Sequence, residues 1–433
     1  MTKKQLLHQW ATSLSLAAQN GILTRGAAPI NQINAITGPR AGALQIDAGL
    51  NTGKLLKALK INEFALHRQF IPWQFPGKPS IYMSGRYLRL EAGWPDHLAE
   101  KNIQLSSLSP YPKGNGRWIA GKNESGATIT LGLSDGVPSW LIGGQTGSGK
   151  SYAMCLAIAQ LSQDTQNQII LLDAKYGQGL GPLANIKNLV GPLATTPNQI
   201  KNALAWACLE MKRRYQTQDY TQRLIIFFDE IQELTGHHSD DEIVWMVRKL
   251  ASQGRAAKVH LIIGTQKPTH KAFSSDAIKG NLVGRLALHV ASYDESRVVL
   301  GSSSPRADHL LGQGDAFAVV PSATQRAQLA YIPTTDLDQY NTAQPTLTQW
   351  PAYNLEDFGN LPTPTPKKLT RFSGKEIAIA LLAAHHNHGR PTLQKLLKQF
   401  NISAGNSKAT NLLTLGRETY NHLNQVGASL TIK

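Results

Sequence analysis

Residues 144–151, Gly-Gln-Thr-Gly-Ser-Gly-Lys-Ser, have the types and spacing of a phosphate-binding loop. The glycines allow backbone N–H groups to point at phosphate oxygens, and a helix that follows the loop adds partial positive charge. Lys150 would reach the β- and γ-phosphates, and the Ser151 hydroxyl would bind Mg²⁺. We therefore predict an ATP and Mg²⁺ site formed by Gly144, Gln145, Thr146, Gly147, Ser148, Gly149, Lys150 and Ser151.

Two carboxylates, Asp229 and Glu230, follow the unbroken apolar run 224–228. Such a run is typical of a strand that is buried on both faces of a parallel sheet, and ligands bind at the carboxyl ends of such strands. Asp229 would hold Mg²⁺ through water, while Glu230 would orient and deprotonate the attacking water. We therefore predict an enzyme that hydrolyses ATP, with Lys150 and Glu230 as catalytic residues.

Strands and helices that alternate along the chain must position these residues. This alternation predicts an α/β fold with a mainly parallel sheet. The expected strands are 140–142, 168–173, 224–228, 259–266, 286–290 and 316–320, and the expected helices are 152–161, 197–216 and 241–252.

Composition divides the 433 residues into five expected parts. A helix at 1–20 and a small α+β subdomain at 21–115 precede the ATPase domain at 116–335. A Pro- and Thr-rich linker at 336–371 leads to a basic helical domain at 372–433. Helices at 374–384, 391–400 and 407–423 and a strand at 430–432 would give that last domain a helix-turn-helix pattern. A helical bundle that docks partner proteins is the alternative.

The net charge of +16 favours a polyanionic partner, because 44 basic residues face only 28 acidic ones. A membrane surface is the competing explanation, but no apolar stretch approaches the roughly 18–20 residues of a spanning helix. The N-terminus lacks the apolar region of a secretion signal, so we expect a cytoplasmic protein without a membrane span. Two cysteines, Cys155 and Cys208, fit a reducing compartment and small core positions.

Several motifs occur in the order found in the FtsK/SpoIIIE DNA translocases. Residues 254–268 resemble the stretch after the second catalytic strand of that family, although Gly264 and Lys267 stand where Ala and Arg are usual. Residues 310–315, Leu-Leu-Gly-Gln-Gly-Asp, resemble its glycine-rich turn. Residues 172–175 and 211–215 resemble two further motifs. The resemblance covers roughly residues 30–335.

The resemblance implies a RecA-like ATPase that forms a homo-oligomer, a hexameric ring around double-stranded DNA, with ATP bound between subunits. Gln266 would sense the γ-phosphate, and Arg255 of a neighbouring subunit would neutralise the transition state. Arg285 and Arg297 are the alternatives to Arg255. Asp173 and Lys175 would form a structural ion pair near the nucleotide or part of the subunit interface.

Loops that face the ring pore would contact DNA phosphates without reading sequence. Residues 176–179 and 267–279 are the candidates, with Lys267, Lys271 and Lys279 as phosphate ligands. The tail resembles the winged-helix domain of many translocases of the family, and its last helix would place Lys408 and Arg417 on DNA. A solvated basic face is the alternative explanation for these charges.

The expected function is ATP-driven translocation of double-stranded DNA. Because the chain lacks the membrane region of the cell-division members, we expect a compact member that serves plasmid, phage or mobile-element DNA, with a recombinase, relaxase or nuclease partner. A conjugative coupling ATPase and a DNA-packaging ATPase are near alternatives. A replication or partition initiator gated by ATP is a further one, and Glu230 argues against it, because a pure assembly switch needs only binding.

Overall fold

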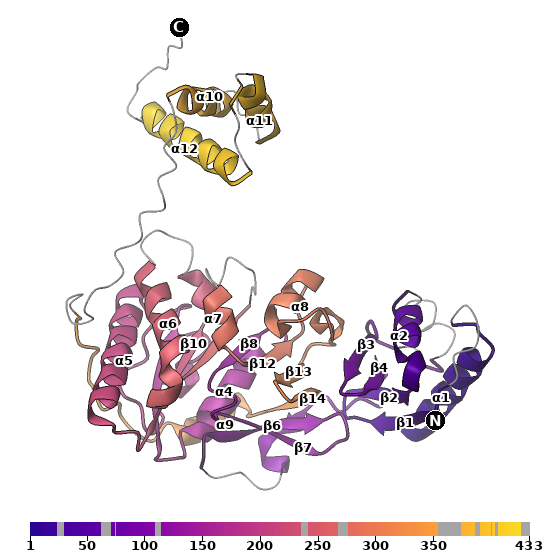
Figure 1. The fold of residues 1–433 in the computed structure, drawn as a ribbon. Helices are drawn as coiled ribbons and strands as arrows, with labels where there is room; N and C mark the ends of the chain where they lie inside the picture. The colour runs from indigo at the N-terminus through magenta and orange to yellow at the C-terminus, as the bar shows by residue number, and fades with distance from the viewer. Residues whose placement is uncertain are drawn as a thin grey trace. The chain divides into compact units, whose positions relative to one another are not determined.

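The computed structural model divides into two compact units, residues 1–358 and 359–433, which are considered separately. Figure 1 shows the elements along the chain. The residues described are 1–23, 30–61, 71–73, 75–108, 114–234, 241–266, 276–353, 374–385, 390–399, 401–402 and 406–425.

The first unit begins with a small antiparallel sheet covered by a helix. Helix α1 (Lys3–Gln19) starts with a capping box in which Thr2 and Gln5 satisfy each other's backbone N–H groups. Its apolar face, which includes Trp10, packs on the sheet together with Trp73 and Trp94. The sheet has the order β1-β2-β4-β3, and its elements are β1 (Gln32–Thr37), β2 (Ala41–Asp47), β3 (Ser80–Ser84) and β4 (Tyr87–Gly93), with helix α2 (Thr52–Ile61) beside it.

The second sheet is the centre of the unit and has the order β7-β6-β14-β13-β12-β8-β11-β10-β9, with β5 paired to β14. The strands from β9 to β12 in this order are parallel, whereas β13, β14, β6 and β7 pair antiparallel. The strands are β5 (Ile103–Gln104), β6 (Arg117–Asn123), β7 (Thr128–Gly132), β8 (Trp140–Gly143), β9 (Asn167–Asp173), β10 (Arg223–Asp229), β11 (Val259–Thr265), β12 (Gly284–Leu288), β13 (Asp315–Val320) and β14 (Ala323–Tyr331).

The prediction of a mainly parallel sheet is therefore wrong for half of this sheet, which is mixed. The reason is the connection between β13 and β14, which is only two residues long. A connection of that length can join antiparallel neighbours only, since a parallel crossover needs a dozen or more residues. The parallel half carries the predicted site strands, and each of the six expected strands is confirmed.

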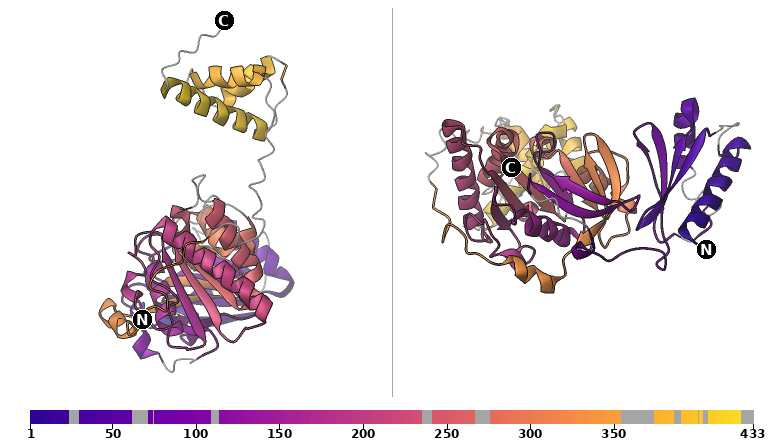
Figure 2. Two further views of the ribbon diagram at one scale, coloured as in Figure 1. Left: turned by 90° about the vertical axis from the view of Figure 1, so that its left-hand side faces the viewer. Right: turned by 90° about the horizontal axis from the view of Figure 1, so that it is seen from below.

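Helices cover both faces of the parallel half (Figure 2). Along β9, Ile169 and Leu171 pack with helix α4 (Lys150–Leu161) on one face, whereas Ile170 and Leu172 pack with α5 (Pro197–Thr217) and α6 (Asp241–Gln253) on the other. This double burial explains the continuous apolar runs in the sequence. Short helices follow at η6 (Gly254–Ala257), α7 (Asp276–Asn281), α8 (Tyr293–Leu300) and α9 (Thr334–Leu337).

A buried ionic network joins the small sheet to the large one. The Arg326 guanidinium on β14 donates to both Asp315 oxygens, at 2.9 and 2.6 Å, and lies 3.4 Å from Glu91 on β4. The Tyr82 hydroxyl donates to Glu91 at 2.7 Å. Because Asp315 follows the glycine-rich turn, this network fixes the turn against the small sheet.

The predicted linker, 336–371, starts on the surface of the ATPase domain. Trp350 is buried against Gly191 and Trp206, and its indole N–H donates to the Pro192 carbonyl at 2.7 Å. The backbone N–H groups of Thr346 and Leu347 also donate to this region, which keeps the first part of the expected linker attached to the domain. Residues 354–373 lie outside the described residues.

The second unit contains three described helices, α10 (Gly374–His385), α11 (Arg390–Gln399) and α12 (Asn406–Gln425), which confirm the three helices expected there. Ile379, Leu393 and Leu412 belong to its small core. A Cβ on Gly416 would lie 2.5 Å from the Ala380 carbonyl oxygen, so α10 and α12 cross where only glycine fits. The expected strand at 430–432 lies outside the described residues.

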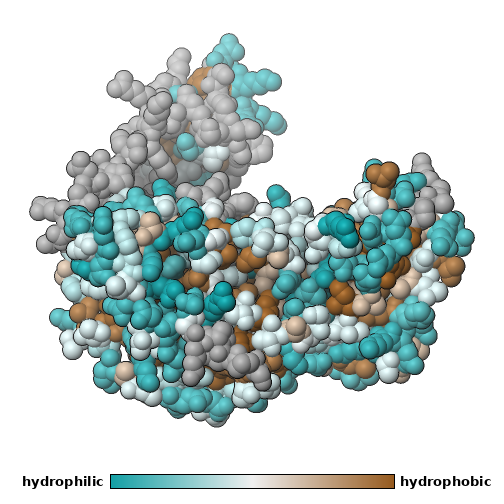
Figure 3. Space-filling model, turned by 60° about the horizontal axis from the view of Figure 1, so that its bottom comes forward, coloured by the Kyte–Doolittle hydropathy of each residue, from teal (hydrophilic) through white to brown (hydrophobic). Residues whose placement is uncertain are grey.

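The face shown in Figure 3 is covered mainly by hydrophilic side chains, with hydrophobic ones in small separate groups. In the described part of the chain, no helix has the length and apolar character needed to cross a membrane.

Candidate nucleotide-binding and hydrolysis site

The phosphate-binding loop lies between β8 and α4, as predicted. Gly149 precedes the helix with φ of 106°, a conformation that favours glycine. A Cβ at this position would lie 3.0 Å from the backbone nitrogen of Gly314. The Gly314 N–H in turn donates to the Ser148 carbonyl at 2.8 Å. The glycine-rich turn at 312–315 therefore supports the loop from behind, which explains why both segments need glycine.

The two predicted carboxylates lie directly beside the loop lysine. Asp229 ends β10, and Glu230 follows it in a left-handed conformation with φ of 58° and ψ of 45°. The Lys150 ammonium contacts Asp229 and lies 3.0 Å from Glu230. Lys150 is 3% exposed, Asp229 2% and Glu230 1%. The structure thus brings together the residues that the sequence assigned to phosphate, metal and water.

The two carboxylates differ in their protonation behaviour. Burial raises the pKa of Asp229 above its ordinary value, and the Lys150 ammonium only partly opposes this effect. Burial also acts on Glu230, but Lys150, the Gln232 amide and Lys175 outweigh it and lower the pKa of Glu230. Glu230 is therefore ionised at neutral pH, as a residue that accepts a proton from water must be.

Gln266 lies at the carboxyl end of β11, where it contacts three parts of the site. Its side-chain oxygen accepts hydrogen bonds of 3.0 Å from the Thr146 hydroxyl and from the Lys175 ammonium. Its backbone N–H donates to Glu230 at 3.2 Å. The Lys175 ammonium also lies 3.5 Å from Glu230. Gln266 thus connects the loop to Glu230, a position that fits the predicted contact with the γ-phosphate.

Asp173 has a structural role that the sequence did not reveal. Its carboxylate accepts the backbone N–H groups of Lys175, Gly179 and Leu180 at 2.8 to 2.9 Å. The ammonium of Lys175 is directed instead to Glu230 and Gln266. Asp173 therefore shapes the loop after β9, whereas Lys175 belongs to the site.

Oxygen ligands for a divalent cation are available at this edge of the sheet. The Ser151 hydroxyl lies on the first turn of α4 and lines the pocket, and Asp229 ends the neighbouring β10. Hydroxyl, carboxylate and water oxygens are the donors that Mg²⁺ prefers. The residue types of Ser151 and Asp229 therefore fit a Mg²⁺ site, and their role as its ligands stays a prediction.

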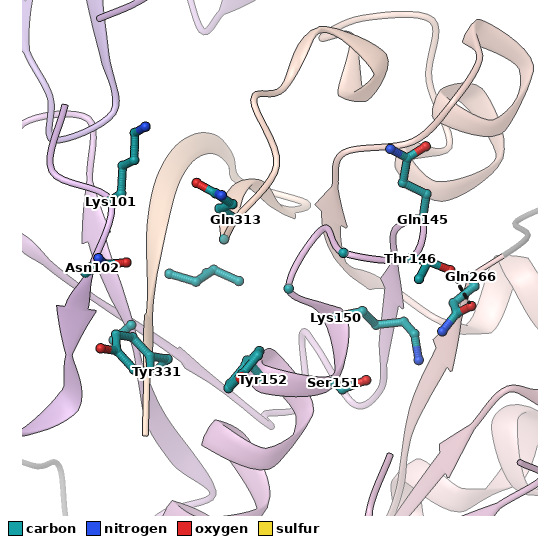
Figure 4. A pocket seen from close by; sticks show the side chains of 15 residues that line it. Lys101, Asn102, Gln145, Thr146, Lys150, Ser151, Tyr152, Gln266, Gln313 and Tyr331 are labelled. Carbon is teal, nitrogen blue, oxygen red and sulfur yellow. Dashed lines mark hydrogen bonds between the residues drawn. The ribbon is translucent and has the colours of Figure 1, made fainter. Parts of the chain in front are cut away.

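A pocket of about 660 Å³ runs along the loop (Figure 4). Lys150, Thr146 and Gln266 lie at one end, and Tyr152, Tyr331 and Asn102 lie at the other. Sequence reasoning missed the second group, which comes from segments far apart in the chain and carries no motif. The missed lining residues are Lys101, Asn102, Tyr152, Gln313, Gly314, Leu329, Ala330 and Tyr331.

None of the three candidate arginines lines this pocket in the described chain. Arg255 is exposed on η6, which precedes the amino end of β11, whereas Gly264 lies near the carboxyl end of that strand. The seven residues of β11 place its two ends about 20 Å apart. Arg285 lies at the start of β12, and burial lowers its pKa to about 10. Arg297 is half exposed on α8 and lies 3.9 Å from Asp294.

The predicted DNA contacts are only partly described. Lys267 and Lys271 lie outside the described residues, and Lys279 and Lys408 lie on α7 and α12 without described side chains. Arg417 is exposed on α12. Tyr176, in the loop that Asp173 shapes, is 81% exposed.

Part of this chain is similar in sequence to a known protein family. Residues 119–222 match the sequence model of the FtsK/SpoIIIE family. The DNA translocase FtsK of Leptospira interrogans is 29% identical over 270 residues, which cover 55% of this chain and 28% of the relative. The FtsK of Lactiplantibacillus plantarum is 30% identical over 307 residues, covering 60% and 38%. The chain thus spans well under half the length of these curated relatives.

Two solved structures share the fold at a TM-score of 0.50. The pCW3 conjugation coupling protein TcpA is 16% identical, and the match covers 78% of this chain and 99% of that one. The cytoplasmic domain of the type VII secretion ATPase EccC from Thermomonospora curvata is 21% identical, covering 59% and 36%. The chain is thus an ATPase, and its residues 119–222 are similar in sequence to the FtsK/SpoIIIE family.

Proposed function

We propose that this protein is an ATP-driven translocase of double-stranded DNA. The observation that carries the proposal is the placement of Glu230, which is buried, ionised and in contact with both Lys150 and the backbone of Gln266. A protein that only bound ATP as an assembly switch would not need a buried base at this point. DNA as the substrate is supported by the relatives named as DNA translocases and by the net charge of +16.

Hydrolysis would begin with an exchange of partners at Lys150. The phosphates of ATP carry more negative charge than Asp229 and Glu230 and would draw the ammonium toward the β- and γ-phosphates. Asp229 and Ser151 would then hold Mg²⁺, which neutralises charge on the phosphate oxygens when it is bound. Glu230, released from the lysine, would take the proton of the attacking water, while Gln266 orients that water against the γ-phosphate.

The site would be completed by a neighbouring copy of the chain. In the described part of the pocket wall, lysines but no arginine line the pocket. Phosphoryl transfer gains strongly from an arginine that neutralises the transition state. We infer that Arg255 of a neighbouring subunit supplies this charge, with Arg285 and Arg297 as alternatives, and that the subunits form a ring, most simply a hexamer.

DNA would pass through that ring. The loop with the exposed Tyr176 and the segment with Lys267, Lys271 and Lys279 would contact the backbone, and Lys408 and Arg417 of a winged-helix-like tail would add contacts outside the pore. The work would take place in the cytoplasm, where ATP and DNA are both available. Plasmid, phage or mobile-element DNA, handed to or from a recombinase, relaxase or nuclease, is the cargo that we propose.

The proposal is tested by steady-state ATP hydrolysis with and without linear duplex DNA, together with sedimentation in the presence of ATP. We expect DNA to stimulate hydrolysis and ATP with DNA to promote a ring-sized species. Lys150→Ala should abolish both effects. Hydrolysis that is indifferent to DNA, in a protein that remains monomeric, would contradict the proposal.

A further inference from the structure

The pocket beside the loop extends beyond the space that phosphates need. Its hydrolytic end is fixed by Lys150, Thr146 and Gln266, because Lys150 also contacts Glu230. Tyr152 and Tyr331 lie at the opposite end (Figure 4). A nucleotide whose γ-phosphate meets Gln266 must therefore extend its base toward the two tyrosines.

The two tyrosines form one aromatic corner. Tyr152 directly follows Ser151 on the first turn of α4 and is 51% exposed, and Tyr331 ends β14. Their ring centroids lie 6.2 Å apart, and the rings are nearly perpendicular at 87°. Perpendicular rings leave no slot between two parallel faces, so a planar base would pack on the face of one ring and against the edge of the other.

The other walls of this end of the pocket consist of apolar side chains and of backbone segments that hydrogen bonds hold together. The apolar side of the pocket includes Leu329, which lines it together with Ala330. The buried Gln328 amide donates to the carbonyl oxygens of Lys101, at 3.1 Å, and of Gln313, at 2.8 Å, so it ties the two sides of the pocket together. Asn102 follows Lys101 and offers an amide, which can donate to and accept from the edge of a base.

We propose that this end of the pocket is the nucleobase site and that it selects purine nucleotides by packing on Tyr152 and Tyr331. Selection rests on ring area, because a purine covers more of the tyrosine face than a pyrimidine does. ATP and GTP should therefore bind more tightly than CTP, and the amide of Asn102 can pair with the edge of either purine. The inference rests on the proposed function, in which ATP is the substrate.

The test compares the binding of ATP, of CTP and of inorganic tripolyphosphate, with Mg²⁺, to the full chain by calorimetry. CTP that bound as tightly as ATP would overturn the purine selection. Tripolyphosphate keeps the phosphate contacts and lacks the base. Tyr331→Ala should weaken ATP binding about tenfold and leave tripolyphosphate binding unchanged, since one base–aromatic contact contributes on that scale. Tyr152→Ala should act in the same direction, and Tyr331→Phe should bind like the native chain.

The matched control is Tyr87→Ala, which removes a tyrosine from the small sheet, outside the pocket. Unchanged ATP affinity in both alanine variants would overturn the inference. Equal losses for ATP and tripolyphosphate would also overturn it, because the tyrosines would then act on the loop and not on the base. If the native chain bound ATP no better than tripolyphosphate, the result would contradict the nucleobase site and remain compatible with the proposed hydrolytic site. Failure of the native chain to bind either ligand would overturn the proposed function and this inference together.

Discussion

The Lys150 ammonium lies 3.0 Å from the Glu230 carboxylate, and both side chains are almost completely buried. The lysine that would bind the phosphates thus neutralises the residue that would activate water. Asp229 shares the same ammonium. In the proposed mechanism, ATP and the two carboxylates would compete for one cation, which would couple substrate binding to the release of Glu230.

Removal of that cation should make stability depend on pH. Lys150→Ala leaves two buried carboxylates side by side, which should lower the free energy of unfolding at neutral pH by about 3 kcal/mol. The pKa of Asp229 is already raised by burial, so the folded state binds its proton at a higher pH than the unfolded chain does. Stability of the variant should therefore increase as pH falls toward that pKa, opposite to the trend of an ordinary salt-bridged aspartate.

The measurement is thermal unfolding of the native chain and of Lys150→Ala across the range from neutral to mildly acidic pH. The difference between the two melting temperatures should shrink as pH falls. A difference that stays constant would show that the variant is destabilised by lost packing and not by unpaired charge.

Gln266 should matter for the chemical step more than for binding. Gln266→Ala removes the contacts to Thr146 and Lys175 and the group that would orient water, so kcat for ATP hydrolysis should fall about a hundredfold while KM changes little. Steady-state kinetics with saturating DNA would measure both constants. Gln163 is exposed in the turn that follows α4, so Gln163→Ala is the matched control. A raised KM with unchanged kcat would assign Gln266 to ground-state binding.

The network around Arg326 should be a main support of the ATPase domain. Arg326→Met leaves Asp315 and Glu91 buried without their shared cation, which should cost about 3–5 kcal/mol of stability. Because Asp315 follows the turn that holds the phosphate loop, ATP affinity should fall as well. Urea unfolding and ATP titration would test this, with the exposed Arg213→Met as a control expected to change little. Equal stability of the two variants would exclude a structural role for the network.

Both cysteines should be inert in the folded protein. Burial raises the pKa of the Cys155 thiol and of the Cys208 thiol to about 12, so almost no reactive thiolate exists at neutral pH. A coloured thiol reagent should label neither residue in native protein and both after unfolding in guanidinium. Rapid labelling of one thiol per chain under native conditions would show that the packing around that cysteine opens readily.

The phosphate and carboxylate part of the site was predictable, because its residues lie in two short segments whose spacing reflects local geometry. The proposed nucleobase end of the pocket was not predictable, because Asn102, Tyr152 and Tyr331 meet only through the pairing of β5 with β14 and the position of α4. Strand β14 itself alternates weakly in hydrophobicity, since it buries Arg326 and Gln328 as partners in polar networks. The antiparallel direction of β14, and therefore the mixed character of the sheet, depends on a short connection that contains no glycine to mark a turn in the sequence.

Asp173 shows a further limit of reasoning from sequence. An acidic residue two positions before a lysine suggested an ion pair, but the path of the loop turns three backbone N–H groups toward the carboxylate. Trp350 shows another. The composition of 336–371 is typical of a linker, yet one buried indole and its hydrogen bond fix residue 350 to the domain.

The central claim, that hydrolysis at Glu230 moves the protein along duplex DNA, is tested most directly by triplex displacement. A third strand bound at one end of a linear duplex is released when a translocating protein reaches it. The native chain with ATP and Mg²⁺ should release the strand, and Glu230→Gln, which retains ATP binding, should not. A native chain that binds DNA and hydrolyses ATP but leaves the triplex intact would contradict the account and favour a loader or initiator.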